Sequence, residues 1–156
     1  MNLYRMLLER AAANRPLRVG MIGAGKFGSM YLAQAKHTPG IHITGIADLS
    51  PDRARSSLAR TGWPADRYAA TSFSAAARSG TTFITEDAQA LLAAPEIDIV
   101  IEATGNPAAG IRHALGAFAH RKHVVMVNVE ILHAIMFSTI HATMNESRVN
   151  HRGMES

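Results

Sequence analysis

The chain has 156 residues, of which 47% are hydrophobic, 18% are charged and none is cysteine, so its length predicts one domain with a substantial hydrophobic core. The formal charge of +4 comes from scattered side chains rather than from a run of Lys or Arg, which argues against a nucleic-acid-binding protein. The absence of cysteine excludes disulfides, thiolate metal sites and cysteine nucleophiles, and since the sequence shows neither a signal-peptide pattern nor a membrane span, we expect a cytoplasmic protein that does not bind membranes.

The first half of the chain is predicted to form a helix and then two strand–helix pairs. Apolar side chains at helical spacing before Pro16 predict an N-terminal helix over residues 2–14, packed beside the main fold. In the second predicted helix the spacing of Phe27, Met30, Tyr31 and Ala35 predicts the apolar face. The elements expected in this half are strand 17–23, helix 26–37, strand 41–48 and helix 50–62.

The second half continues the same alternation. Small residues dominate 63–80, where we expect a loop and a short helix. The strands are nearly continuous in apolar residues, which is typical of a parallel sheet covered by helices on both faces. The further elements expected are strand 81–87, helix 87–94, strand 97–104, helix 107–121 and strand 123–129.

The segment GAGKFG (23–28) follows the first predicted strand and opens the next predicted helix. In a dinucleotide-binding loop the first glycine allows a tight turn, the second lets the backbone approach the pyrophosphate, and the third lets helix and strand pack closely. The phosphates then lie at the N-terminal end of the helix. We therefore expect cofactor contacts from the loop residues Gly23, Ala24, Gly25, Lys26, Phe27 and Gly28. The context predicts a Rossmann-type doubly wound parallel sheet of the α/β class, in three αβα layers, with an extra N-terminal helix.

Asp48 ends the second predicted strand, twenty positions after Gly28. An acid at this place is expected to hydrogen-bond the adenosine ribose, which favours NAD because a carboxylate repels a 2′-phosphate. Nearby Ser50, Arg53 and Arg55 leave NADP open, although a solvated helix face is the simpler interpretation of the two arginines. The predicted cofactor is therefore NADP or NAD.

Two further polar segments follow the last predicted strands. In EATGNP (102–107), Thr104, Gly105 and Asn106 are placed to bond the nicotinamide ribose, or alternatively form a plain turn with Asn106 as the helix cap. In VNVE (127–130), Asn128 and Glu130 are candidates for binding a substrate or a metal, or are simply polar residues at a strand end. No metal motif is expected elsewhere, since the later histidines are too widely spaced.

The segments RVGMIGAGKFG, GIADLSPDRA, DIVIEATGNP and KHVVMVNVE together resemble the N-terminal half of the homoserine-dehydrogenase-like NAD(P)-dependent oxidoreductases. The resemblance is to the branch that carries a C-terminal SAF domain and includes enzymes similar in activity to 1-deoxy-D-xylulose 5-phosphate reductoisomerase. It implies Gly23, Gly25 and Gly28 at the pyrophosphate, Asp48 at the adenosine ribose and residues 104–106 at the nicotinamide ribose. Homoserine dehydrogenases proper have an Asn-Lys pair where this chain has Asn128-Val129, which argues against homoserine as substrate.

The resemblance covers about residues 2–130, so we expect an NAD(P)-binding domain over 1–130, with 1–16 as helix and linker. Residues 131–156 do not resemble the family continuation, and we expect a tail that is helical to 144 and then disordered. The expected function is nicotinamide-dependent hydride transfer on a small polar or phosphorylated substrate, in a chain lacking its catalytic domain. No catalytic residue is predicted, a homo-oligomer is left open, and the alternative is a non-catalytic nucleotide-binding module or sensor.

Overall fold

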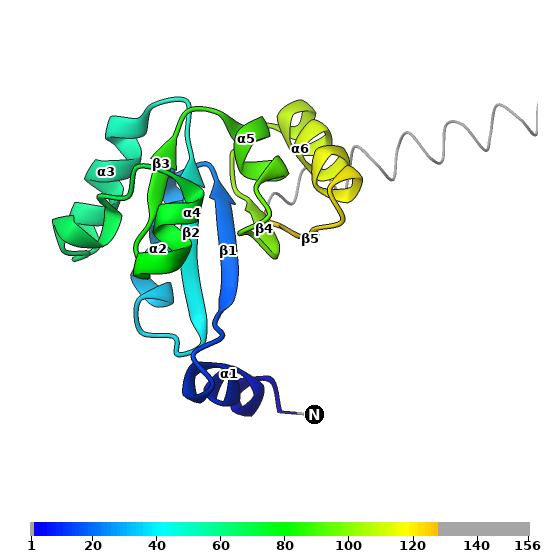
Figure 1. Cartoon of the computed structure of the whole chain (residues 1–156). Helices are drawn as coiled ribbons and strands as arrows, with labels where there is room; N and C mark the ends of the chain where they lie inside the picture. Colours follow the sequence, from blue (N-terminus) through cyan, green and yellow to red (C-terminus); the bar gives the residue numbers. More distant parts are fainter. Residues whose placement is uncertain (1, 128–156) are drawn as a thin grey trace, which may run out of the picture.

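The computed structural model describes residues 2–127. Its centre is a parallel five-stranded sheet with the strand order β3-β2-β1-β4-β5 (Figure 1). The chain builds the sheet outward from β1 in one direction and then returns to add β4 and β5 on the other side, so the order reverses between β1 and β4. The strands are β1 (Leu17–Ile22), β2 (Ile41–Ala47), β3 (Phe83–Thr85), β4 (Ile99–Glu102) and β5 (His123–Met126).

Helices cover both faces of the sheet, as the sequence predicts. On one face, side chains of α2 and α3, including Leu32 and Leu58, pack on Met21 and Ile43 of the strands. On the other face, side chains of α4, α5 and α6 pack on the strand residues of a second core. The helices are α1 (Leu3–Ala12), α2 (Lys26–Ala35), α3 (Pro51–Arg60), a short 3-10 helix η1 (Ala65–Tyr68), α4 (Phe73–Ser79), α5 (Ala88–Ala93) and α6 (Pro107–Ala119). The three-layer Rossmann-type fold is thereby confirmed.

Polar side chains cap the helices that follow β2, β3 and β4, whereas α2 after β1 begins at Gly25 without a side-chain cap. The Ser50 side chain accepts a hydrogen bond from the Arg53 N–H, and Pro51 occupies the first turn of α3, as predicted. Asn106 caps α6 by accepting from the Ala109 N–H at 3.0 Å. These caps fix where α3 and α6 begin, and therefore where the loops after β2 and β4 end.

The predicted apolar face of α2 is wrong in part. Phe27 and Met30 are 57% and 59% exposed, whereas Gly28, Leu32 and Ala35 face the core. Gly28 explains the difference, because a Cβ there would lie 2.4 Å from the carbonyl oxygen of Gly23. This close approach turns Gly28 and the residues four and seven positions later toward the sheet.

Some predicted bounds also change. The strand expected over 81–87 is only Phe83–Thr85, and that expected over 97–104 is Ile99–Glu102. Residues 63–80 contain η1 and α4, close to the expected loop and short helix. The N-terminal helix α1 has no buried side chain and touches the main fold where the Leu7 carbonyl lies against Gly40. No helix within residues 2–127 has the length and apolar character needed to cross a membrane.

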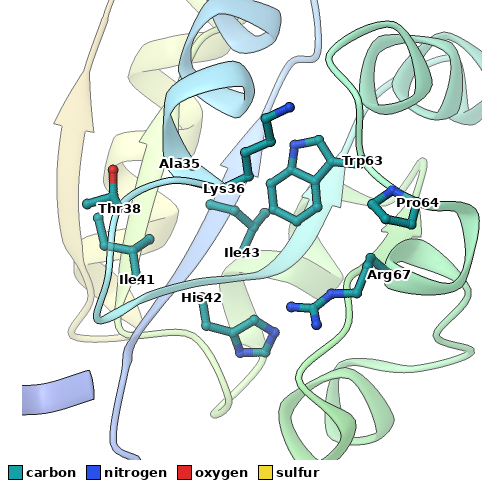
Figure 2. Close-up of a pocket in the computed structure, with 9 residues that line it drawn as sticks. All are labelled: Ala35, Lys36, Thr38, Ile41, His42, Ile43, Trp63, Pro64 and Arg67. Carbon is teal, nitrogen blue, oxygen red and sulfur yellow. The ribbon is translucent and has the colours of Figure 1, made fainter. Parts of the chain in front are cut away.

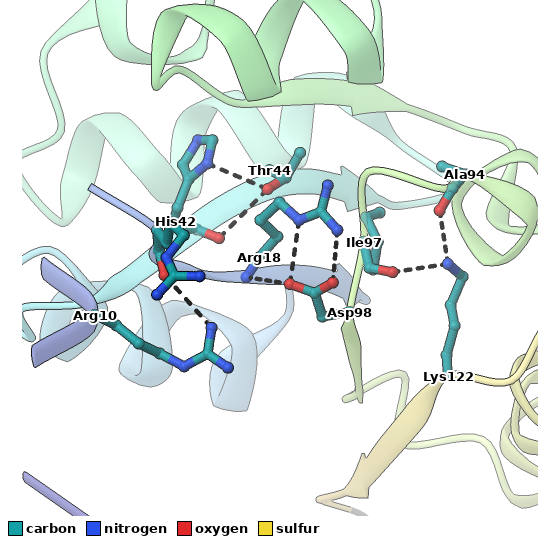
Figure 3. A network of polar contacts seen from close by, with 9 residues as sticks. Arg10, Arg18, His42, Thr44, Ala94, Ile97, Asp98 and Lys122 are labelled. Atoms are coloured by element: carbon teal, nitrogen blue, oxygen red, sulfur yellow. Dashed lines mark hydrogen bonds and ion pairs between the residues drawn. The ribbon is translucent and has the colours of Figure 1, made fainter. Parts of the chain in front are cut away.

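An ion pair and a buried lysine fix the amino edge of the sheet (Figure 3). The Arg18 guanidinium donates to both carboxylate oxygens of Asp98, at 2.6 and 3.1 Å, and the Arg18 backbone N–H donates to the same group. Lys122 donates to the carbonyls of Ala94 and Ile97, at 2.6 and 2.8 Å. These contacts hold β1, β4 and the end of α5 in register, away from the carboxyl edge.

Candidate functional site

A cleft of about 410 Å³ opens at the carboxyl edge of the sheet, where the strand order reverses. Its walls come from the loops after β1, β2, β3 and β4 and from the first turns of α6. Among its lining residues are six that the sequence singles out: Gly23, Gly25, Asp48, Arg53, Thr104 and Asn106. Ligands of doubly wound folds bind at this position, because loops from both halves of the sheet converge there.

In the glycine loop a Cβ would have free space at Gly25 but not at Gly23 or Gly28. Gly23 has φ +94, and a Cβ there would lie 2.8 Å from the backbone of Ala103 and Thr104. Gly28 is pressed against the Gly23 carbonyl, so a Cβ fits at neither position. Around Gly25, by contrast, a Cβ would meet no atom within 4 Å. The backbone at Gly25, just before α2, is therefore open to a ligand that approaches closely.

The other loop residues lie differently. Ala24 is buried, and its N–H donates to the Asp48 carboxylate at 2.7 Å. Lys26 and Phe27 are exposed and do not line the cleft. The glycines are thus the residues that shape the loop, and cofactor contacts by Lys26 and Phe27 stay predictions.

The Asp48 side chain is fully buried, and both of its oxygens are occupied. Oδ2 accepts from the Ala24 N–H, while Oδ1 accepts from the Ser50 N–H at 2.8 Å and from Arg53 Nη2 at 2.7 Å. Arg53 lines the cleft with its side chain 57% exposed, so it is more than the solvated residue that its helix position suggests. Arg55 instead pairs with Asp52 on the surface of α3. At the end of β2 the cleft therefore presents a guanidinium beside a satisfied carboxylate.

The turn after β4 is held by its own polar groups. The Thr104 hydroxyl donates to Glu102 Oε1, and the Asn106 N–H donates to the Thr104 hydroxyl at 3.3 Å. Gly105 has φ +72, a conformation that suits glycine. The alternative interpretation of Asn106 as a helix cap is confirmed, and Asn106 also lines the cleft.

Sequence reasoning missed two residues next to this turn, Glu102 and His113. Glu102 is 0% exposed, and its Oε1 lies 3.3 Å from Nδ1 of His113, which lines the cleft from α6. Its Oε2 is buried and has no hydrogen-bond partner among the described residues. The available signal was the carboxylate that interrupts the apolar strand IVIEAT, since a buried acid requires a partner.

Asn128 and Glu130 lie outside the described residues, as do the later histidines. Within residues 2–127 no group of three or more His, Asp or Glu side chains is arranged to hold a metal ion. A second cavity, of about 370 Å³, lies at the amino end of β2 between Lys36, His42, Trp63 and Arg67 (Figure 2). It is at the opposite end of β2 from Asp48, so the predicted site residues within the described range gather on the carboxyl side alone.

A family model described as "Oxidoreductase family, NAD-binding Rossmann fold" matches residues 17–126. A homoserine dehydrogenase from Thiobacillus denitrificans is similar in structure, with 21% identity, a TM-score of 0.59 and coverage of 85% of this chain and 28% of that one. The myo-inositol dehydrogenase of Lactobacillus casei, in complex with NAD(H) and myo-inositol, has 18% identity and a TM-score of 0.53, over 71% of this chain and 28% of that one.

An NAD-binding protein from Listeria innocua is also similar, with 24% identity and a TM-score of 0.51, over 81% of this chain and 33% of that one. No curated protein matches the chain. The chain therefore spans about a third or less of the length of these solved structures, and at such identities the likeness is one of fold.

Proposed function

The chain belongs to the oxidoreductase family with an NAD-binding Rossmann fold, and on that premise we propose that the cleft at the carboxyl edge holds the dinucleotide with its pyrophosphate on the glycine loop. The observation that carries the proposal is the free space around Gly25, where a Cβ would meet no atom within 4 Å. At Gly23 and Gly28, by contrast, a Cβ would collide with the backbone. A pyrophosphate needs the backbone N–H groups at the start of α2 without a side chain in front of them.

The proposal extends to the adenosine half of the cofactor. Asp48 and Arg53 form a pair at the end of β2, and the guanidinium is the more exposed partner. Because Arg53 offsets the charge of Asp48 and keeps donors toward the cleft, we propose that the site accepts a 2′-phosphate as well as a free ribose hydroxyl. NADPH and NADH then both bind, and Arg53 is the residue that binds the 2′-phosphate of NADPH.

At the other end of the cleft we assign Thr104, Gly105 and Asn106 to the nicotinamide half. Thr104 and Asn106 line the cleft at the end of β4, which is the side away from Asp48 in the strand order. The nicotinamide supplies the hydride when bound, and the residues of this chain bind and orient it. Asn128 and Glu130 follow β5 in the sequence and remain our candidates for the substrate side.

The reaction of the whole protein is proposed at a coarser level. We propose nicotinamide-dependent hydride transfer on a small polar or phosphorylated substrate, in the homoserine-dehydrogenase-like branch with a SAF domain. The supporting features are the joint motifs around Gly23, Asp48 and residues 102–107. The division into a cofactor domain over 1–130 and a separate segment over 131–156 belongs to the same proposal.

Titration of the chain with NADH and with NADPH tests the cofactor assignment. Calorimetry, or quenching of the single Trp63 with energy transfer to the reduced nicotinamide, reports binding. We expect saturable binding of both cofactors at submillimolar concentration. The absence of binding by either one up to millimolar concentration would refute the assignment.

A further inference from the structure

Building on the proposed cofactor site, we propose that His113 is a ligand of the dinucleotide, accepting a hydrogen bond from an amino group of the cofactor, and that Glu102 is the positioning residue that keeps its Nε2 free to accept. His113 lines the same cleft as Asp48 and Arg53, yet it lies on α6 and belongs to none of the sequence motifs. Among the described residues that line this cleft, His113 is the one histidine.

The hydrogen bonds around Glu102 determine which nitrogen of His113 carries the proton. Glu102 Oε1 accepts from the Thr104 hydroxyl at 2.5 Å and from the Thr104 N–H at 3.4 Å. The third group on this oxygen is His113 Nδ1, at 3.3 Å. An oxygen that accepts from its neighbours requires a donor here, so Nδ1 carries the hydrogen. In the neutral imidazole Nε2 is then a bare acceptor.

The His113 side chain is partly exposed and borders the cleft. Among the side-chain nitrogen and oxygen atoms of the described residues, Glu102 Oε2 is the one that is both buried and without a partner. No hydrogen bond joins His113 Nε2 to another described residue, and the His113 side chain is 14% exposed. Since His113 lines the cleft, its side chain borders the space proposed for the cofactor, and we infer that Nε2 is the nitrogen available to it.

The burial of Glu102 restricts the orientation of the His113 ring. The carboxylate is 0% exposed at the end of β4, beneath α6, and cannot turn toward water. A carboxylate that orients a histidine through one nitrogen fixes the ring plane and the direction of the other nitrogen. A buried carboxylate with an unsatisfied oxygen has a cost in stability, and its orienting effect on a ligand-binding histidine provides a reason for its presence here.

Because His113 Nε2 is a hydrogen-bond acceptor, NAD analogues that lack an amino group are suitable probes of the contact. A nicotinamide adenine dinucleotide carries two amino groups, one on the adenine ring and one on the nicotinamide carboxamide. Nicotinamide hypoxanthine dinucleotide replaces the first by an exocyclic carbonyl oxygen, and nicotinic acid adenine dinucleotide replaces the second by a carboxylate oxygen. Each replacement sets an acceptor against Nε2, so the analogue that binds more weakly identifies which amino group His113 contacts. His113 shares Glu102 Oε1 with Thr104, which is assigned to the nicotinamide half, so its position favours the amino group of the nicotinamide carboxamide.

The test is a calorimetric titration of the intact chain with NAD and with both analogues. We expect wild-type protein to bind one analogue about three- to tenfold more weakly than NAD, the effect of one hydrogen bond. In His113→Ala the discrimination disappears. In His113→Gln, whose amide oxygen offers an acceptor, part of it returns. The matched control His120→Ala, in the exposed cap of α6, keeps the wild-type ratio.

Glu102→Gln tests the positioning role, because the amide can donate to Nδ1 and move the imidazole hydrogen to Nε2. The expected result is a narrowed or inverted ratio between NAD and the analogue, and an unchanged ratio would overturn the role of Glu102. Equal affinity of the wild type for NAD and both analogues would overturn the contact by His113, as would a ratio unaffected by His113→Ala. Wild-type protein that binds no dinucleotide would refute the cofactor site as well, which separates the two failures.

Discussion

The Asp48 carboxylate accepts a hydrogen bond from the backbone N–H of Ala24 at 2.7 Å, which ties the end of β2 to the glycine loop after β1. Ala24 lies between Gly23 and Gly25, so the contact holds the glycine loop against the end of β2. The same carboxylate receives the Ser50 N–H and Arg53 Nη2. Asp48 thus shapes the cofactor loop and positions a cation beside it.

Replacing Asp48 by Asn tests this structural role. All three neighbours of the carboxylate are donors, so the amide NH₂ of Asn must face a donor wherever it turns. We expect a loss of about 1–3 kcal/mol in the free energy of unfolding, measured by urea denaturation. The matched control Asp52→Asn changes a carboxylate that is 95% exposed and should leave stability nearly unchanged. Equal effects of the two substitutions would contradict the role of Asp48.

Replacing Arg53 by Gln tests the admission of the 2′-phosphate. The guanidinium is 57% exposed at the edge of the cleft, and loss of a charge-assisted contact to phosphate should weaken NADPH binding about tenfold. NADH affinity should change much less, because its ribose hydroxyl is uncharged. Titrations of both cofactors give the ratio, and Arg55→Gln serves as control because Arg55 pairs on the surface with Asp52. A parallel loss for NADH and NADPH would count against the assignment.

Much of the site was predictable because its signals are local. The glycine spacing, the acid at the end of the second strand and the EATGNP turn each follow an apolar run, and parallel strands bring their carboxyl ends to one edge. The contact between Glu102 and His113 was not predictable in this way. It joins a strand end to the second turn of a helix eleven residues later, and no hydrophobic period marks it.

The errors in the predicted elements have physical causes too. The face of α2 follows the tight packing of Gly28 on Gly23 rather than the apolar pattern, which leaves Phe27 exposed. Strand β3 pairs with β2 over three residues, and the polar residues around it gave no sharp boundary. The sequence leaves Arg53 open between a 2′-phosphate contact and a solvated helix face, because its approach to Asp48 depends on the position of the first turn of α3, which Ser50 caps.

The amino edge of the sheet supports a stability prediction for Asp98→Asn (Figure 3). Burial alone would raise the pKa of Asp98, but the hydrogen bonds and charge of Arg18 outweigh it and lower this pKa below its usual value. Because the two side chains are 37% and 34% exposed, solvent screens the pair, and we expect the substitution to cost about 1–2 kcal/mol at neutral pH.

The cost of Asp98→Asn should depend on pH in a defined direction. A lowered folded-state pKa gives stability above the pKa of the unfolded chain, and this stability is lost as the pH falls through the folded value. The difference between wild type and variant in urea unfolding should therefore shrink in acid. The exposed pair of Arg5 and Glu9 offers the control Glu9→Gln, for which little effect is expected. A difference that grows in acid would contradict the account.

The burial of His42 leads us to expect a second pH dependence of stability, at a higher pH than that of Asp98. Burial lowers its pKa below 6.5, and the positive charges of Arg67 and Arg18 add to this, against a raising contribution from the hydrogen bond to the Thr81 carbonyl. The unfolded chain therefore takes up a proton at a higher pH than the folded one, so stability falls as the pH drops below about 6.5 toward the folded-state pKa.

Urea unfolding between about pH 8 and pH 5 measures this effect. His42→Gln should flatten the dependence, because the amide does not titrate in this window and can still donate to the Thr81 carbonyl. The exposed His37, changed to Gln, is the control and should leave the slope as it is. A slope that His42→Gln leaves unaltered would show that another group is responsible.

The central claim is that the glycine loop holds the pyrophosphate, and Gly25→Ala tests it most directly by NADH titration beside thermal unfolding. A Cβ at Gly25 meets no protein atom within 4 Å, whereas one at Gly28 would lie 2.4 Å from the Gly23 carbonyl. We predict that Gly25→Ala stays folded, with only the small loss expected for alanine at a helix N-cap, but binds NADH at least tenfold more weakly, while Gly28→Ala lowers the unfolding temperature much more. Wild-type NADH affinity in a stably folded Gly25→Ala variant would contradict the claim.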